Sequence, residues 1–146
     1  MSIEAIELWH KRARPEPTFE TFNVQLGCHF EEIAEMLVAL AGEDGVTQNK
    51  LSELGYQIMG LAEGFKSGKF KAYASQREEF LDSLVDQIVT GVGVAYCDGM
   101  KITQAVGEVN KSNWSKFDHE GKPYFDNNGK IKKGPNYIPP KLEGMA

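Results

Sequence analysis

The sequence predicts an all-α protein whose helical core is followed by an extended C-terminal arm with a small β-hairpin. Apolar residues recur at helical spacing through most of the first 110 positions, and from Asp118 on glycines, prolines and an Asn-Gly pair replace that pattern. The chain has 146 residues, 41% hydrophobic and 25% charged, which suits one globular domain. We therefore expect residues 1–117 to form the helical core and 118–146 an arm of the same domain.

The first two helices are predicted from their end signals. Residues 2–14 read as a short helix, which Pro15 and Pro17 end. From Thr18 a longer helix is expected to run to about Ala41, where a glycine-rich turn closes it.

The third helix is predicted from apolar spacing between Leu51 and Phe65, with Thr47 or Ser52 as its cap. The Gly-Phe-Lys-Ser-Gly-Lys stretch that follows reads as a loop. It lacks the Gly directly before Lys-Ser and the preceding strand of a phosphate-binding P-loop, so we exclude that motif.

The fourth helix is expected over 77–96, with Ser75 as cap and Glu78 completing a capping box. A short helix follows over 102–110. In the arm, Asn128 and Gly129 separate two strand-like runs, which is typical of a β-hairpin.

Two acidic stripes point to metal chemistry. Glu31, Glu32 and Glu35 project from one side of a helix, and no Lys or Arg occurs between residues 15 and 49 to neutralise them, so a counter-ion must come from elsewhere. A second stripe, Glu79, Asp82 and Asp86, lies opposite apolar residues expected in the core: Leu81, Leu84, Val85, Ile88, Val92 and Ala95. Carboxylates without His or Cys favour Mg²⁺ or Mn²⁺ over zinc.

Charge and composition limit the partners. The net charge is −5, and basic residues outnumber acidic ones only from residue 111 on, which argues against a nucleic-acid binder. No apolar run reaches the roughly 18 residues of a membrane span, and no signal-peptide pattern opens the sequence, so a cytoplasmic location is expected. Cys28 and Cys97 have no metal-like spacing.

Several motifs together resemble a known family. The Glu31-Glu32-x-x-Glu35 motif, the Asp82 and Asp86 pair, the Asn110-Lys111-Ser112-Asn113 stretch and the Lys-Gly-Pro-Asn-Tyr-x-Pro-Pro tail are similar to those of MazG-like enzymes, particularly phage-type members, in the all-α NTP pyrophosphatase superfamily. The resemblance runs from about residue 9 to 142. It implies a four-helix-bundle core that cleaves a (d)NTP to the (d)NMP and diphosphate, with dGTP and GTP among the candidate substrates, in nucleotide-pool control. It also implies a homodimer or homotetramer whose helices share the site.

The resemblance further implies the site residues. The metal ligands would be Glu32, Glu35, Asp82 and Asp86, holding two or more Mg²⁺ ions with Mn²⁺ as a substitute. The sequence departs from the family at Ser83, because the family has a ligand three positions before Asp86. Asp82 is therefore assigned as the ligand, and Glu79 is a candidate for an indirect contact with the metal. Glu31 or Glu35 would accept the proton of the attacking water. The nucleotide would be contacted by Asn110, Lys111, Asn113, Lys116 and Trp9.

Two other classes of protein compete with this interpretation. A carboxylate-bridged iron protein requires Glu-x-x-His pairs, and Val38 follows Glu35 at that distance, so this alternative is weak. A non-catalytic interaction domain with acidic faces remains the principal alternative.

Overall fold

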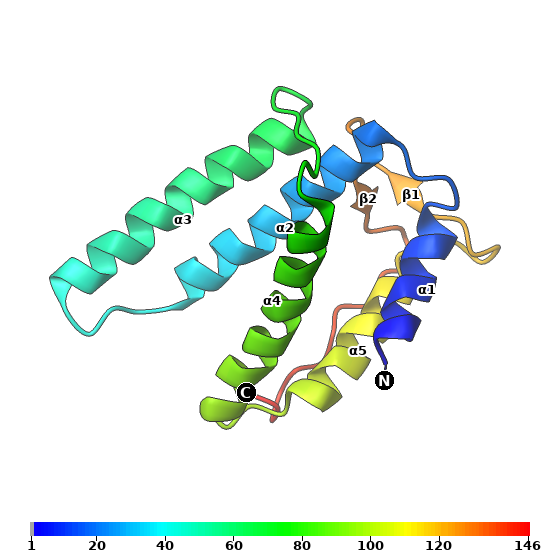
Figure 1. Cartoon of the computed structure of the whole chain (residues 1–146). Coiled ribbons are helices and arrows are strands. Elements are labelled where there is room, and N and C mark those ends of the chain that lie inside the picture. The colour runs from blue at the N-terminus through cyan, green and yellow to red at the C-terminus, as the bar shows by residue number, and fades with distance from the viewer. Residues whose placement is uncertain (1) are drawn as a thin grey trace. The chain divides into compact units, whose positions relative to one another are not determined.

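The computed structural model describes residues 2–146, which form five helices and a two-stranded hairpin (Figure 1). In chain order the elements are α1 (Ile3–Ala13), α2 (Phe19–Ala39), α3 (Gly45–Lys66), α4 (Arg77–Cys97), α5 (Ile102–Trp114), β1 (Tyr124–Phe125) and β2 (Ile131–Lys132). The prediction of an all-α protein with a small C-terminal hairpin is confirmed.

The chain divides into two compact units. The first contains residues up to Pro15, 73–124 and 131–146, and so holds α1, α4, α5 and most of the C-terminal arm. The second contains residues 16–72, which include α2 and α3, together with the hairpin tip, 125–130. The arm contributes to both units, so this division differs from the boundary expected between residues 117 and 118.

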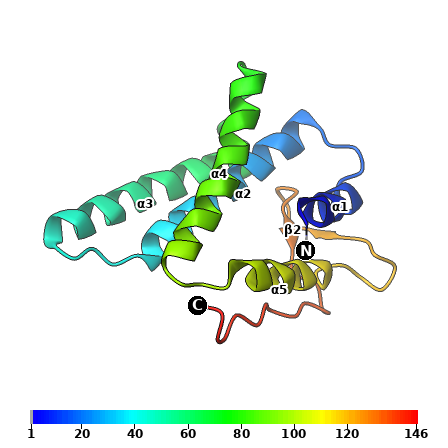
Figure 2. The ribbon, with the colours of Figure 1, turned by 60° about the horizontal axis from the view of Figure 1, so that its bottom comes forward.

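In the second unit, α2 and α3 pack side by side in opposite directions (Figures 1 and 2). Small residues line their contact, because Gly27, Ala34, Gly55 and Ala62 are all buried. A Cβ atom added at Gly27 would lie 2.8 Å from the carbonyl oxygen of Ala62. The two backbones therefore approach too closely at this point for any side chain.

The end signals of these helices were predicted with mixed success. Thr18 and Thr21 cap α2 reciprocally, each hydroxyl accepting a hydrogen bond from the other residue's N–H. The prediction for α3 was wrong at its start: neither Thr47 nor Ser52 is the cap. The Asp44 carboxylate accepts from the Thr47 N–H at 2.7 Å, so the helix begins six residues before Leu51.

The first unit has a core built around one tryptophan. Trp9, Ala13 and Phe117 are buried, and Ile131 packs against them. The Trp9 and Phe117 rings are stacked, with centroids 5.6 Å apart. This contact holds α1 against the segment that follows α5.

The predictions for α4 and α5 need three corrections. Gln76 rather than Ser75 occupies the N-cap position of α4, and no side chain caps it. No residue of α4 is buried, so its apolar stripe is not part of the core of this single chain. Helix α5 continues to Trp114 rather than ending at Asn110.

The C-terminal arm returns along α5 (Figure 2). Its middle is held by Ile138, whose N–H donates to the Ser115 hydroxyl at 2.8 Å. Its end is held at Lys101, whose backbone N–H donates to the Met145 carbonyl at 2.7 Å and whose ammonium donates to the Gly144 carbonyl. The arm is thus tied to both ends of this helix.

Two turns in the arm have the same construction. Residues 118–122 and 126–130 both read Asp-x-x-Gly-Lys after a Phe. In each, the Asp carboxylate accepts from the backbone N–H groups two and four positions on, at 2.8 to 2.9 Å, and the Gly has a φ of 74° or 80°. The first turn is held to α1 by Arg12, whose guanidinium donates to the carbonyls of Glu120 and Gly121.

Candidate functional site

The acidic face of α2 lies in the second unit. Glu31, Glu32 and Glu35 fall within two turns of this helix; Glu31 is half-buried, whereas Glu32 and Glu35 are exposed. Two of the three predicted carboxylates are therefore open to solvent at neighbouring positions of one helix face.

The third carboxylate, Glu31, is held by two lysines. The Lys66 ammonium lies 2.7 Å from its Oε1 atom, and the Lys130 ammonium lies 2.5 Å from its Oε2 atom. Lys66 also pairs with Glu63 at 2.5 Å. Side-chain exposure is only 17% for Glu31 and 10% for Lys66, so this pairing is shielded from water. The missing counter-charge of the acidic helix thus comes from α3 and from the hairpin tip.

These contacts shift the pKa values of both partners. Burial raises the pKa of Glu31, but the hydrogen bonds from Lys130 and Lys66 outweigh it and leave the pKa below its ordinary value of 4.5. Burial lowers the pKa of Lys66, but Glu31 and Glu63 outweigh it and leave the pKa above 10.5. Glu31 therefore stays ionised at neutral pH and has a low affinity for a proton.

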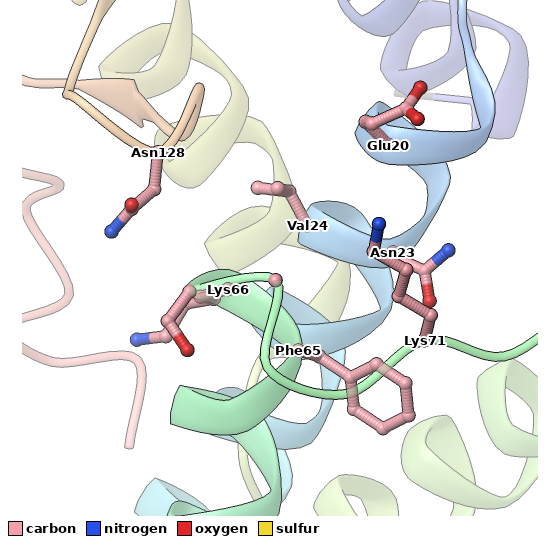
Figure 3. A pocket seen from close by; sticks show the side chains of 9 residues that line it. Glu20, Asn23, Val24, Phe65, Lys66, Lys71 and Asn128 are labelled. Carbon is pink, nitrogen blue, oxygen red and sulfur yellow. The ribbon is translucent and has the colours of Figure 1, made fainter.

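A pocket of about 230 Å³ opens beside this cluster. It is lined by α2, by the end of α3 with its following loop, and by the hairpin tip (Figure 3). Its residues are Glu20, Asn23, Val24, Phe65, Lys66, Ser67, Gly68, Lys71 and Asn128. The loop is fixed by Asn23, whose side-chain oxygen accepts from the Ala72 N–H at 2.7 Å and whose amide nitrogen donates to the Phe19 carbonyl. The pocket therefore has a fixed wall and a lysine on its lining.

The second predicted pair of ligands is on a different unit. Asp82 and Asp86 are exposed on α4, as is Glu79. Within residues 2–146, no group of three or more His, Cys, Asp or Glu side chains is placed to hold a metal ion. The four predicted ligands thus comprise one pair on each unit.

The pair on α2 fits Mg²⁺ in the kind of atoms it offers. Glu32 and Glu35 supply carboxylate oxygens one turn apart, and Cys28 and His29 lie one turn before Glu32 on the same helix. Two carboxylates are fewer than the ligands of a complete Mg²⁺ site.

The residues predicted to contact the nucleotide belong to the first unit. Asn110 is buried and Asn113 is half-buried on the last turns of α5, three positions apart and so on one side of the helix. Lys111 is exposed and pairs with Glu108 at 2.6 Å. The Lys116 ammonium lies 5.8 Å from the centre of the Trp9 ring.

Trp9 is packed rather than open. Its ring is 6% exposed, with Phe117 stacked on one face. Its indole N–H is buried and has no hydrogen-bond partner among the described residues. The Trp9 ring therefore offers no open face on which a base could stack.

One helix in the described part of the chain, α4, is long and apolar enough to cross a membrane. None of its apolar window is buried. A single helix of this kind is weak support for a membrane span, because water-soluble helices pass the same test.

Sequence reasoning missed Lys66 and Lys130. It predicted that a distant cation must neutralise the α2 glutamates, without identifying it. One signal was present, since Lys130 closes the second Asp-x-x-Gly-Lys turn and the first such turn occurs eight residues earlier.

Comparisons with protein families, curated proteins and solved structures found no match to this chain.

Proposed function

We propose that the protein is a Mg²⁺-dependent nucleoside triphosphate pyrophosphohydrolase of the MazG-like kind. It would convert a (d)NTP and water to the (d)NMP and diphosphate in nucleotide-pool control, with dGTP and GTP among its substrates. The observation that carries the proposal is the acidic face of α2, where Glu32 and Glu35 are exposed while Glu31 is neutralised by two lysines.

In this proposal Glu32, Glu35, Asp82 and Asp86 hold the ions, with Mn²⁺ able to replace Mg²⁺. Two or more bound ions would neutralise part of the phosphate charge and make a nearby water more acidic. The carboxylates would determine where the ions bind. A four-helix-bundle core would bring the two pairs of carboxylates together.

Glu31 is a poor candidate for the general base. A general base needs a pKa that lets it hold the proton it removes, and the lysines lower the pKa of Glu31. Glu35 is exposed one turn further along the same face. We therefore assign the base to Glu35 and a positioning role to Glu31.

The nucleotide contacts are assigned to the end of α5. Asn110 and Asn113 share one side of this helix, and Lys111 and Lys116 carry positive charge next to them. The Trp9 N–H adds a donor without a partner among the described residues. Amide and N–H groups suit the edges of a base, whereas the lysines suit phosphate oxygens.

A homodimer or homotetramer in the cytoplasm is part of the proposal. Its support is α4, which has no buried residue and leaves several apolar side chains exposed in one chain. A membrane is the poorer alternative, because Asp82 and Asp86 lie within the helix and a charged residue at the bilayer centre costs about 2.5–3.5 kcal/mol.

Pyrophosphate release with the eight common NTPs and dNTPs, with and without Mg²⁺, tests the activity. Glu35→Gln should abolish turnover and weaken stabilisation by Mg²⁺, which depends on the ratio of ion concentration to Kd. Glu53→Gln is the matched control, because Glu53 is an exposed glutamate of α3 away from the acidic face. A Glu35→Gln protein that cleaves nucleotides at the wild-type rate would refute the proposed site.

A helical interaction domain is the second candidate, favoured by the same uncovered α4. Such a protein would bind a partner through its acidic and apolar faces. It would show no saturable stabilisation by Mg²⁺ and no pyrophosphate release, so one titration separates the two functions.

A further inference from the structure

The pocket on the second unit and the ion cluster at Glu31 share one residue, Lys66. This lysine lines the pocket and at the same time pairs with Glu31. Lys130 pairs with the other oxygen of Glu31 and lies two positions after Asn128, which also lines the pocket. Lys66 therefore lines a pocket that the proposed activity has not yet used, and Lys130 is linked to Lys66 through Glu31.

The two lysines have hydrogen-bonding capacity to spare. An ammonium group carries three N–H donors. The ion pairs of Lys66 use two of them, with Glu31 and Glu63, and the ion pair of Lys130 uses one. Three N–H donors therefore remain on Lys66 and Lys130, which the Glu31 carboxylate holds close together. A group with several acceptor oxygens, such as phosphate, matches this arrangement.

The other charges around the pocket are negative, so an anion could bind there only with the help of the lysines. The pocket lies at the C-terminal end of α3, where the helix dipole places partial negative charge and disfavours anions. Glu20 also lines it. Attraction for an anion must then come from Lys66, Lys71 and Lys130, so removing one of them should have a large effect.

We propose that this pocket holds the phosphate chain of the nucleotide, with Lys66 and Lys130 as its direct contacts. The inference rests on the proposed function, because Glu31 precedes Glu35 by one turn and places the lysines beside the carboxylates assigned to the metal. It assigns the phosphate chain to the end of α3 and the hairpin tip. Glu31 competes with phosphate for the lysine donors and holds them in place when no nucleotide is bound.

Binding of inorganic tripolyphosphate, measured by calorimetry with and without Mg²⁺, tests the pocket. Lys66→Met and Lys130→Met should each weaken binding about tenfold or more, since each removes a charge-assisted hydrogen bond. Lys132→Met is the matched control, because Lys132 is an exposed lysine on the same hairpin outside the pocket, and its affinity should stay within about twofold of wild type. Lys130→Arg keeps the positive charge and should bind tripolyphosphate about as well as the wild type. This result would show that the loss in Lys130→Met comes from the missing charge and not from misfolding.

Equal losses of affinity in Lys130→Met and Lys132→Met, or no saturable binding of tripolyphosphate by the wild type, would overturn the inference. Wild-type protein that binds tripolyphosphate but cleaves no nucleotide would refute the proposed function and leave the phosphate contacts standing.

Discussion

Glu31 is the residue at which the acidic helix gains its counter-charge. Its partners lie 35 and 99 positions further along the chain, and the lysine pairs leave it largely shielded from water. An unpaired carboxylate at this depth would lose hydration without compensation. The cluster therefore makes the negative charge of Glu31 permanent near neutral pH, and it fixes the hairpin tip against α2.

Stability should depend on pH through this residue. Because the pKa of folded Glu31 is lowered, its contribution is fully present above about pH 4.5 and is lost as the pH falls through the lower folded value. The raised pKa of Lys66 keeps the partner charged until the pH rises through a value above 10.5. Urea unfolding at pH 7, 5 and 3 should show Glu31→Gln less stable than wild type at the first two, with the difference shrinking at the third. A difference that does not change with pH would contradict the ion cluster.

Substitutions on α4 test which carboxylates bind metal. Asp82→Asn should reduce turnover as much as Asp86→Asn, because each removes one proposed ligand, whereas Glu79→Gln should be milder. All three residues are exposed, so the fold should not depend on them. Turnover rates and melting temperatures, both with and without Mg²⁺, make the comparison. A Glu79→Gln variant more damaged than Asp82→Asn would reverse the assignment.

The sequence predicted the acidic face but not the residues that complete it. The placement of Glu31, Glu32 and Glu35 on one helix follows from local spacing alone. The choice of Lys66 and Lys130 depends on how α3 and the hairpin tip fold back onto α2. No local rule specifies such long-range partners, so only the need for a cation was predictable.

At the scale of elements, the α2 and α3 pair is held by close backbone contact. Gly27 faces the Ala62 carbonyl, and Ala34 and Ala62 are completely buried. Small residues bring the helix axes together and place the Lys66 side chain within reach of Glu31.

Two glycines on these helices should respond oppositely to alanine. Gly27→Ala places a methyl group against backbone atoms and should destabilise the protein by about 1–3 kcal/mol. Gly60→Ala has open space around it and should stabilise α3 by about 0.5–1 kcal/mol, because alanine loses less backbone freedom on folding. Urea unfolding of both variants measures this. Equal effects would mean that the close approach at Gly27 is not important for stability.

Helix existence was predictable from apolar spacing, whereas helix ends were less so. The third helix starts earlier than predicted because the Asp44 carboxylate accepts a hydrogen bond from the Thr47 N–H in its first turn. The glycines on either side of Asp44 made this stretch look like a break between helices. Helix α4 starts without the predicted Ser75 cap. The tertiary partners of α4 could not be predicted at all, because its periodicity shows an apolar face but not what covers it.

At the scale of the whole molecule, the uncovered α4 predicts self-association. Val85 and Val92 are 49% and 47% exposed and lie two turns apart on one face. Light scattering should give a multiple of the chain mass of 16.3 kDa at micromolar concentration. Val85→Asp and Val92→Asp should shift the mass toward the monomer while circular dichroism stays helical, since a buried charge disfavours the interface. A wild-type mass of 16.3 kDa would refute the prediction.

The distance along the chain between Glu31 and Lys130 also sets an order of events during synthesis. Lys130 is added to the chain roughly 3 to 13 s after Lys66 at translation rates of 5–20 residues per second. During that interval the nascent chain contains only one of the two lysines that pair with Glu31. A chain that ends before the hairpin would therefore leave Glu31 without its second cation.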